Sequence, residues 1–330
     1  MAVSLNRRRF IGIIAATAGL SLLPLGRIGM AETQPVTWSG QALGARATLV
    51  IHHHDRAAAG RLVERVVVEV ARLERIFSLY REDSALVELN RVGALAAPPV
   101  ELVRLLEISR QFWTLTEGAF DPTVQPMWML HARHFSTVDA DPAGPSSDSR
   151  REVLGRVGLD KVKFSRDRVA FSRPGMALTF NGIAQGYITD RIVDLLREGG
   201  IASSLVDMGE ARAIGTRPDN SAWKVGVSAS PLIESDLSET LDIVDKAVAT
   251  SSVLGFRFDE ARRFNHLLDP RSGAAARRWE AVTVVAPEAA TADALSTAFN
   301  LMEPGAIASI ARAQSGLQVH LADRGDIIRL

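Results

Sequence analysis

The chain has 330 residues, no cysteine, and equal numbers of basic and acidic residues, 38 of each. The lack of cysteine excludes disulfides, thiol catalysis and cysteine-based metal sites, while a hydrophobic content of 47% allows a sizeable core. The balanced charge argues against a nucleic-acid-binding protein, which needs a basic surface to neutralise phosphates.

Residues 1–31 have the features of a twin-arginine-type signal peptide. A basic segment at 6–10, NRRRF, precedes an uncharged apolar stretch at 11–26, and Gly-Met-Ala at 29–31 is a small-x-small cleavage sequence. The apolar stretch is short and rich in Gly and Ala, which disfavours a membrane span, although an uncleaved anchor is the alternative. We therefore expect twin-arginine export to the periplasm and a mature domain at 32–330. Because the leader holds four arginines and no acid, that domain has 34 basic and 38 acidic residues, a net charge of −4.

Hydrophobic periodicity along the mature chain predicts an α+β fold with antiparallel sheets and packed helices. Apolar positions at helical spacing predict helices over about 57–80, 100–117 and 184–197, and another that starts near Thr291. Alternating or continuous apolar runs predict strands, including 37–53, 281–287 and the segment around 263–268. The stretches 118–128 and 136–152, rich in Gly, Pro, Ser or Asp, are predicted to be loops.

The segment TADALSTAFNLM at 291–302 places a carboxylate and a hydroxyl on one helix face. Asp293 and Thr297 are four residues apart, so both project from the same side. Hard oxygen ligands of this kind suit Mg²⁺, and a helix N-terminus would favour phosphates beside it. Taken alone, such a pair is more often just two ordinary residues in the first turns of a helix.

Two other segments carry weaker signals. FNGIAQGYITD at 180–190 places Gly182 and Gly186 at the start of a helix, where they allow either ligand approach or plain helix packing. RFNHLLDPRSG at 263–273 holds His266 in a short strand before a turn, where a structural histidine is the alternative to a catalytic one. The histidines at 52–54 and at 131 and 134 lack a further ligand at a diagnostic spacing, so we do not expect them to bind a metal.

Eight motifs follow one another in a specific order, and their succession resembles the ApbE family, the exported FAD:protein FMN transferases. They are ALGA (42–45), SLYREDSALVELN (78–90), GAFDPTV (118–124), GIAQGY (182–187), VDMGE (206–210), ATSS (249–252), NHLLDPRSG (265–273) and ADALSTA (292–298). The resemblance covers about 37–315 and implies a T-fold-like architecture. It also implies transfer of FMN from FAD to a Thr or Ser hydroxyl of a membrane-linked redox protein, with release of AMP.

The resemblance carries site residues onto this chain. Asp293, Thr297 and the backbone carbonyl of Gly182 match the family's Mg²⁺ ligands, with Mn²⁺ as an alternative ion. His266 matches a histidine that we interpret as the general base toward the acceptor hydroxyl. The positions implied to contact FAD, or to lie near it, are Leu43, Tyr80, Ala119, Phe120, Asp121, Thr179, Gln185 and Leu267.

Three of these positions depart from the family pattern. Leu43 replaces a methionine, Thr179 an aspartate, and Gln185 a lysine or glutamate, which puts the FAD contacts in question. The variant pattern is similar to the NosX-type branch, which would make the acceptor a membrane regulator of nitrous oxide respiration. Two alternatives stay open: an FAD pyrophosphatase that releases FMN and AMP, and a non-catalytic periplasmic protein that binds FAD.

Overall fold

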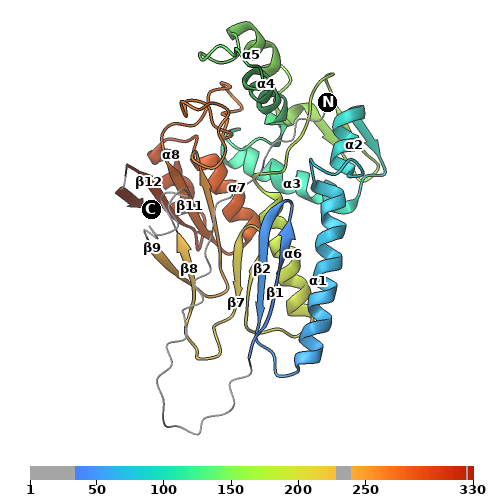
Figure 1. Cartoon of the computed structure of the whole chain (residues 1–330), viewed down its shortest axis with the longest axis vertical. Helices are drawn as coiled ribbons and strands as arrows, with labels where there is room; N and C mark the ends of the chain where they lie inside the picture. Colours follow the sequence, from blue (N-terminus) through green and yellow to red (C-terminus); the bar gives the residue numbers. More distant parts are fainter. Residues whose placement is uncertain (1–33, 228–238, 325) are drawn as a thin grey trace.

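An eight-stranded antiparallel sheet forms the centre of the molecule (Figure 1). The computed structural model describes residues 34–227, 239–324 and 326–330, so the signal peptide expected at 1–31 lies outside the described residues. Along the sheet the strands are β1 (Val36–Ala42), β2 (Ala45–Ile51), β6 (Ser204–Asp207), β7 (Ala211–Ile214), β10 (Ala247–Ser252), β11 (Ala281–Ala286), β12 (Gln318–Asp323) and β13 (Asp326–Arg329).

The two faces of this sheet bury different cores, because successive side chains along a strand point in opposite directions. Val206 and Ala249 belong to the large core under the helices, whereas their neighbours Leu205 and Val248 belong to a smaller core on the other face. A hairpin of β8 (Trp223–Val227) and β9 (Glu239–Ile243) covers this smaller core. The sheet is thus buried on both faces at its centre, which explains its continuous apolar strands.

Three helices, α1 (Arg56–Phe77), α6 (Ala184–Glu198) and α7 (Ala289–Phe299), pack on the sheet face that carries the larger core (Figure 1). The other helices are α2 (Ala85–Val92), α3 (Val100–Leu115), α4 (Gln125–Phe135), α5 (Ser147–Leu154) and α8 (Pro304–Ala313), of which α4 and α5 pack on each other at one end of the molecule. The longest, α1, begins at the N-cap Asp55, whose carboxylate accepts from the backbone of Ala57 and Ala58. The bounds of α1, α3 and α6 agree with the helices predicted from periodicity.

Three local predictions were wrong. The loops predicted at 118–128 and 136–152 contain the start of α4 and most of α5, the latter begun by Ser146, which accepts from the backbone of Ser149. The strand predicted around 263–268 is instead an irregular segment held by isolated bridges, Arg257 to Asn265 and Leu268 to Ala275.

A third, small sheet in the order β3 (Ala94–Ala96), β5 (Arg168–Phe171) and β4 (Val162–Phe164) completes the fold.

None of the helices within the described residues combines the length and the apolar character that a membrane crossing requires.

Candidate active site

The helices α6 and α7 approach each other closely because the residues between them are small. A Cβ on Gly186 would lie 2.3 Å from the carbonyl oxygen of Ala289, so only glycine fits at this point of α6. Across the contact, the backbone N–H of Gly186 donates to Oδ2 of Asp293 at 3.0 Å. The packing alternative considered for Gly186 is therefore correct, and this packing also fixes Asp293.

The structure brings together the three residues predicted to bind the metal. A Cβ added to Gly182 would lie 2.9 Å from Oγ1 of Thr297, so the backbone of Gly182 lies directly against that hydroxyl. Asp293 lies one turn earlier on α7 and is 3% exposed. Burial raises the pKa of Asp293 to about 7, opposed by the Gly186 hydrogen bond. A bound divalent cation would remove the cost of ionising this carboxylate.

Ser251, at the end of β10, is a site residue that the sequence reasoning missed. Its hydroxyl lies 3.1 Å from Oγ1 of Thr297 and 2.9 Å from the hydroxyl of Ser296. The motif ATSS contains it, but a serine within a strand gives no signal of its own. The hydroxyl pair of Ser251 and Thr297 adds oxygen donors of the type that Mg²⁺ prefers.

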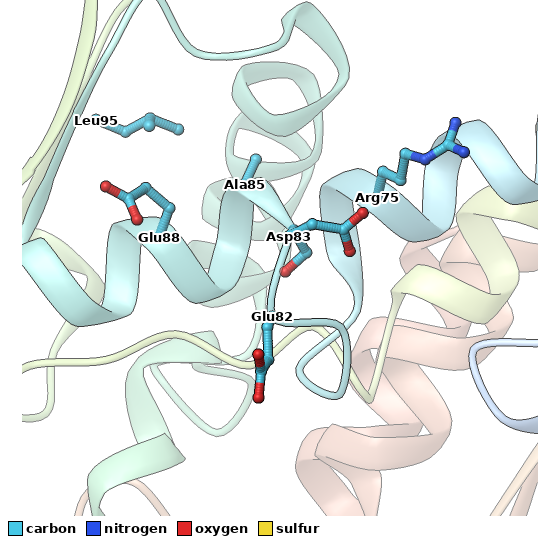
Figure 2. Close-up of a pocket in the computed structure, with 7 residues that line it drawn as sticks. Arg75, Glu82, Asp83, Ala85, Glu88 and Leu95 are labelled. Atoms are coloured by element: carbon cyan, nitrogen blue, oxygen red, sulfur yellow. The ribbon is translucent and has the colours of Figure 1, made fainter.

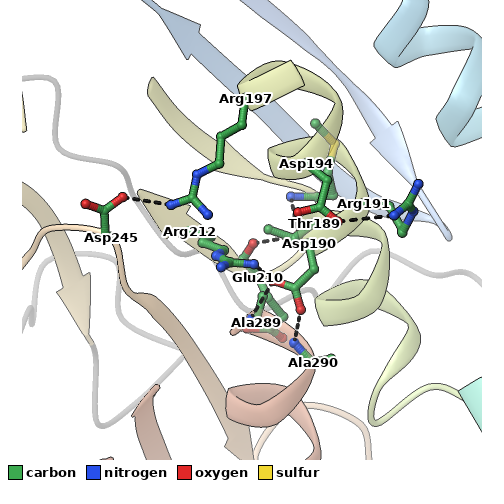
Figure 3. Close-up of polar contacts among 11 residues, drawn as sticks. Thr189, Asp190, Arg191, Asp194, Arg197, Glu210, Arg212, Asp245, Ala289 and Ala290 are labelled. Atoms are coloured by element: carbon green, nitrogen blue, oxygen red, sulfur yellow. Dashed lines mark hydrogen bonds and ion pairs between the residues drawn. The ribbon is translucent and has the colours of Figure 1, made fainter. Parts of the chain in front are cut away.

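Two of the N–H groups at the N-terminus of α7, where the sequence suggested phosphate binding, are already bound within the protein. The carboxylate of Asp190 accepts from the backbone of Ala289 at 2.8 Å and of Ala290 at 2.9 Å, and it also pairs with Arg212 (Figure 3). These contacts occupy two of the helix's free N–H groups. Charge stabilisation of phosphates would therefore depend mainly on a cation held at the Asp293 face of α7.

His266 is held by the backbone of Phe256. Its ring Nδ1 lies 3.1 Å from the Phe256 carbonyl oxygen and 3.4 Å from the Phe256 nitrogen. The shorter contact favours a proton on Nδ1, which leaves Nε2 as a lone-pair acceptor. Burial lowers the pKa of His266, so the neutral ring predominates at pH 7. A neutral imidazole with a free nitrogen is the form that a general base requires.

The His266 segment is anchored to the loop before α4 and to the end of α7. Arg271 pairs with Asp269 and donates to the carbonyl of Leu301, just beyond α7. Its side chain also lies against Gly118. These contacts link the histidine segment to two other predicted site segments.

Among the positions implied to lie near FAD, Asp121 has a structural role. Its carboxylate accepts from the ring of Trp113, from both the backbone and the hydroxyl of Thr123, and from the backbone of Leu159, at 2.6–3.0 Å. Burial raises the pKa of Asp121, and these four donors oppose the rise. A flavin contact by this residue would have to come from its backbone, because its carboxylate oxygens are already engaged.

The other positions implied near FAD lie on several loops, except Gln185, which lies in the first turn of α6. Thr179 donates its backbone N–H to Pro122, so these two loops are adjacent, and Leu43 donates its backbone N–H to Glu74 of α1. Gln185 lies against Gly209, whose added Cβ would clash with the Gln185 amide at 2.4 Å. Ala119, Phe120 and Leu267 are buried, and Tyr80 is 51% exposed. Their contacts with FAD stay predictions.

A surface cavity of about 380 Å³ opens beside α2 (Figure 2). Its lining includes the carboxylates of Glu82, Asp83 and Glu88 and one cation, Arg75. Three carboxylates would repel the pyrophosphate of a dinucleotide, and none of the predicted site residues lines this cavity. It is therefore not a candidate flavin site.

The histidines set aside from metal binding make local contacts. Nδ1 of His131 lies 2.9 Å from the Met127 carbonyl, and Nε2 of His134 lies 2.8 Å from the Asp141 carbonyl. Within residues 34–227, 239–324 and 326–330, three or more His, Cys, Asp or Glu residues nowhere gather in a metal-binding arrangement. A metal at Asp293 would thus depend on hydroxyl, carbonyl and water oxygens.

The sequence model of the ApbE family matches residues 43–321, which is most of the chain. The chain belongs to the ApbE family. An ApbE-family FAD:protein FMN transferase from Haemophilus influenzae is 26% identical over 330 residues, covering 96% of this chain and 93% of that protein. One from Treponema pallidum is 28% identical over 256 residues, covering 72% of this chain and 70% of that protein.

Solved structures of ApbE proteins share the fold. The crystal structure of the ApbE protein from Thermotoga maritima superposes with a TM-score of 0.78 at 26% identity, covering 90% of this chain and 97% of that one. The mixed fold of antiparallel sheets and packed helices predicted from the sequence is confirmed. The family resemblance drawn from the eight motifs is confirmed as well.

Proposed function

We propose that this protein is a divalent-metal-dependent FAD:protein FMN transferase that acts in the periplasm. The observation that carries the proposal is the meeting of Gly182, Asp293 and Thr297 where α6 packs on α7. These groups offer a carbonyl, a carboxylate and a hydroxyl, which fit Mg²⁺ or Mn²⁺. The similarity to proteins named FAD:protein FMN transferase supports the same reaction.

In the proposed reaction, a Thr or Ser hydroxyl of the acceptor attacks the FMN phosphorus of FAD. A new oxygen–phosphorus bond forms, the bond to the bridging oxygen breaks, and AMP leaves. Asp293, Thr297 and the Gly182 carbonyl would hold the metal, which would neutralise charge on the pyrophosphate oxygens. His266 accepts the hydroxyl proton at Nε2, while the carbonyl of Phe256 fixes its ring.

The acceptor is proposed to be a membrane-linked redox protein that faces the periplasm. The twin-arginine-type leader at 1–31 supports this compartment, and the departures at Leu43, Thr179 and Gln185 favour a NosX-type acceptor, the regulator of nitrous oxide respiration. Gln185 lies against the backbone of Gly209, so its position depends on the segment that follows β6.

The test uses the purified protein, FAD, Mg²⁺ and the periplasmic domain of the candidate acceptor. We expect flavin fluorescence on the acceptor band after denaturing electrophoresis, with AMP released in equal amount, and loss of both with EDTA. AMP without a fluorescent band for any acceptor would indicate the pyrophosphatase instead. Bound FAD with neither product would indicate the non-catalytic FAD-binding protein.

A further inference from the structure

The acidic segment DMGE at 207–210 joins β6 to β7 beside the contact between α6 and α7. The proposed reaction gives this segment no role. Glu210 comes immediately before β7, where the register pairs Ala211 with Val248 of β10. Ala211 faces the smaller core, so alternation turns Glu210 and Arg212 toward α6 and α7. Figure 3 shows Glu210 where α6 and α7 meet the sheet, near Thr189 and Asp190.

Glu210 is buried without a full set of partners. It is 7% exposed, and its Oε2 has no hydrogen-bond partner among the described residues. The carboxylate receives one hydrogen bond, from the backbone of Thr250, while the Glu210 carbonyl is occupied by the Thr189 hydroxyl. A buried carboxylate oxygen without a donor is costly, so Oε2 of Glu210 is available to accept a hydrogen bond from a ligand or from a bound water.

The neighbours of Glu210 connect it to the proposed metal site. Thr250, which donates to it, precedes Ser251, whose hydroxyl contacts Thr297. The pKa of Glu210 is raised well above its ordinary value by burial first, and then by the negative charges of Asp293 and Asp207. Arg212, the nearest cation in sequence, pairs with Asp190. Glu210 therefore lies close enough to Asp293 for their charges to interact, and a cation beside them would favour the ionised form of both acids.

We propose that Glu210 is a positioning carboxylate of the metal site, whose Oε2 accepts a hydrogen bond from a water bound to the divalent cation. The inference rests on the proposed function. Mg²⁺ usually keeps several of its waters in protein sites, and acids that bind those waters orient them. The described residues provide no arrangement of three carboxylates that would bind the ion directly, which fits one direct carboxylate, Asp293, and one that acts through water.

The test is the affinity of the EDTA-treated and dialysed protein for Mg²⁺ and Mn²⁺, measured by isothermal titration calorimetry. We expect Glu210→Gln to raise the Kd by roughly tenfold or more, the usual effect of losing a group that orients metal ligands. Glu64→Gln, which removes an exposed charge from α1, is the control and should leave the Kd unchanged. Thermal unfolding without metal should show Glu210→Gln to be as stable as wild type or more so.

Two further variants show whether Glu210 acts through a specific hydrogen bond or only through its negative charge near the metal. Asp207→Asn should raise the Kd less than Glu210→Gln, because Asp207 already accepts from the backbone of Gly209. Glu210→Asp keeps the charge but shortens the side chain, and should give an intermediate Kd. A Kd for Glu210→Gln within twofold of wild type, or an equal loss in Asp207→Asn or Glu64→Gln, would overturn the inference. A wild-type protein that binds neither metal would overturn the proposed function as well.

Discussion

At the scale of single residues, the surroundings of His266 suit the role of general base that we propose for it. The carbonyl of Phe256 receives the Nδ1 proton, and burial keeps the ring neutral. A histidine in this state accepts a proton at Nε2 without first losing one. A purely structural histidine could have the same hydrogen bond and the same neutral ring. A kinetic measurement separates the two roles.

We expect His266→Ala to lower the rate of flavin transfer by about 10²–10⁴-fold, the usual contribution of general base catalysis. The wild-type rate should fall as the pH drops through a pKa below the ordinary value of 6.5, because protonation removes the accepting lone pair and burial lowers that pKa. Single-turnover transfer between pH 5 and 8 checks both. An alanine variant that retains the wild-type rate would return His266 to a structural role.

For Asp121 we predict an effect on the stability of the fold. Four hydrogen-bond donors converge on its buried carboxylate, from three separate segments. Asp121→Ala leaves these donors unpaired and should lower the free energy of unfolding by roughly 2–4 kcal/mol. Urea denaturation measures the change. Asp139→Ala, on an exposed position of the loop after α4, is the control and should have little effect.

At the scale of elements, the packing of α6 on α7 sets the position of Asp293, the proposed metal ligand. Small residues let the helices approach until the Gly186 amide reaches Asp293. Ser251 then joins the Thr297 hydroxyl to β10. The face of α7 that carries Asp293 and Thr297, the proposed metal ligands, is therefore positioned by one neighbouring helix and one strand.

Substitution of Gly186 tests this contact. Gly186→Ala places a Cβ 2.3 Å from the Ala289 carbonyl, so α6 must move and its amide must leave Asp293. We expect a loss of about 1–3 kcal/mol in the free energy of unfolding, with weaker metal binding. Gly60→Ala in α1 is the matched control, since nothing lies within 4 Å of its added Cβ; it should stabilise by about 0.5–1 kcal/mol. Equal stability of the two variants would contradict this account.

The elements show what the sequence could predict. Long helices with one apolar stripe, such as α1 and α3, follow from periodicity because the stripe faces a core. The helix α5 was missed because its short polar sequence buries only Val153, which leaves no stripe to detect. The segment around His266 alternates like a strand, but it pairs only through isolated bridges, which depend on distant partners.

For the site, sequence spacing placed Asp293 and Thr297 on one face of a helix. The order of motifs added Gly182 and His266. Neither residue spacing nor motif order points to Ser251 or Glu210. A serine in a strand and a glutamate in a turn are common in proteins and usually have only structural roles. Their importance follows from tertiary contacts with Thr297 and with the charge of Asp293.

At the scale of the whole molecule, the proposed metal site predicts that a divalent cation stabilises the fold, because several acids are buried near it. Asp207, Glu210 and Asp293 all have raised pKa values, with burial as the first cause. A cation would offset their repulsion and bind only the folded chain. Mg²⁺ at about 100 times its Kd should therefore stabilise the protein by about 2.7 kcal/mol.

Thermal unfolding with and without Mg²⁺ measures this stabilisation. In Asp293→Asn the gain from Mg²⁺ should largely disappear, because the only direct carboxylate ligand is gone. The metal-free variant should be at least as stable as the metal-free wild type, since a buried acid has been removed. A variant that gains as much from Mg²⁺ as wild type would place the metal elsewhere.

The central claim is that the Asp293 face of α7 carries metal-dependent transfer of FMN to a protein hydroxyl. The most direct test is the intact mass of the acceptor domain after incubation with FAD, Mg²⁺ and either wild-type protein or Asp293→Asn. We predict that wild type adds one FMN, less water, to a Thr or Ser of the acceptor, and that Asp293→Asn does so at least about a hundredfold more slowly. Equal rates for the two proteins, or flavin addition that continues in EDTA, would contradict the claim.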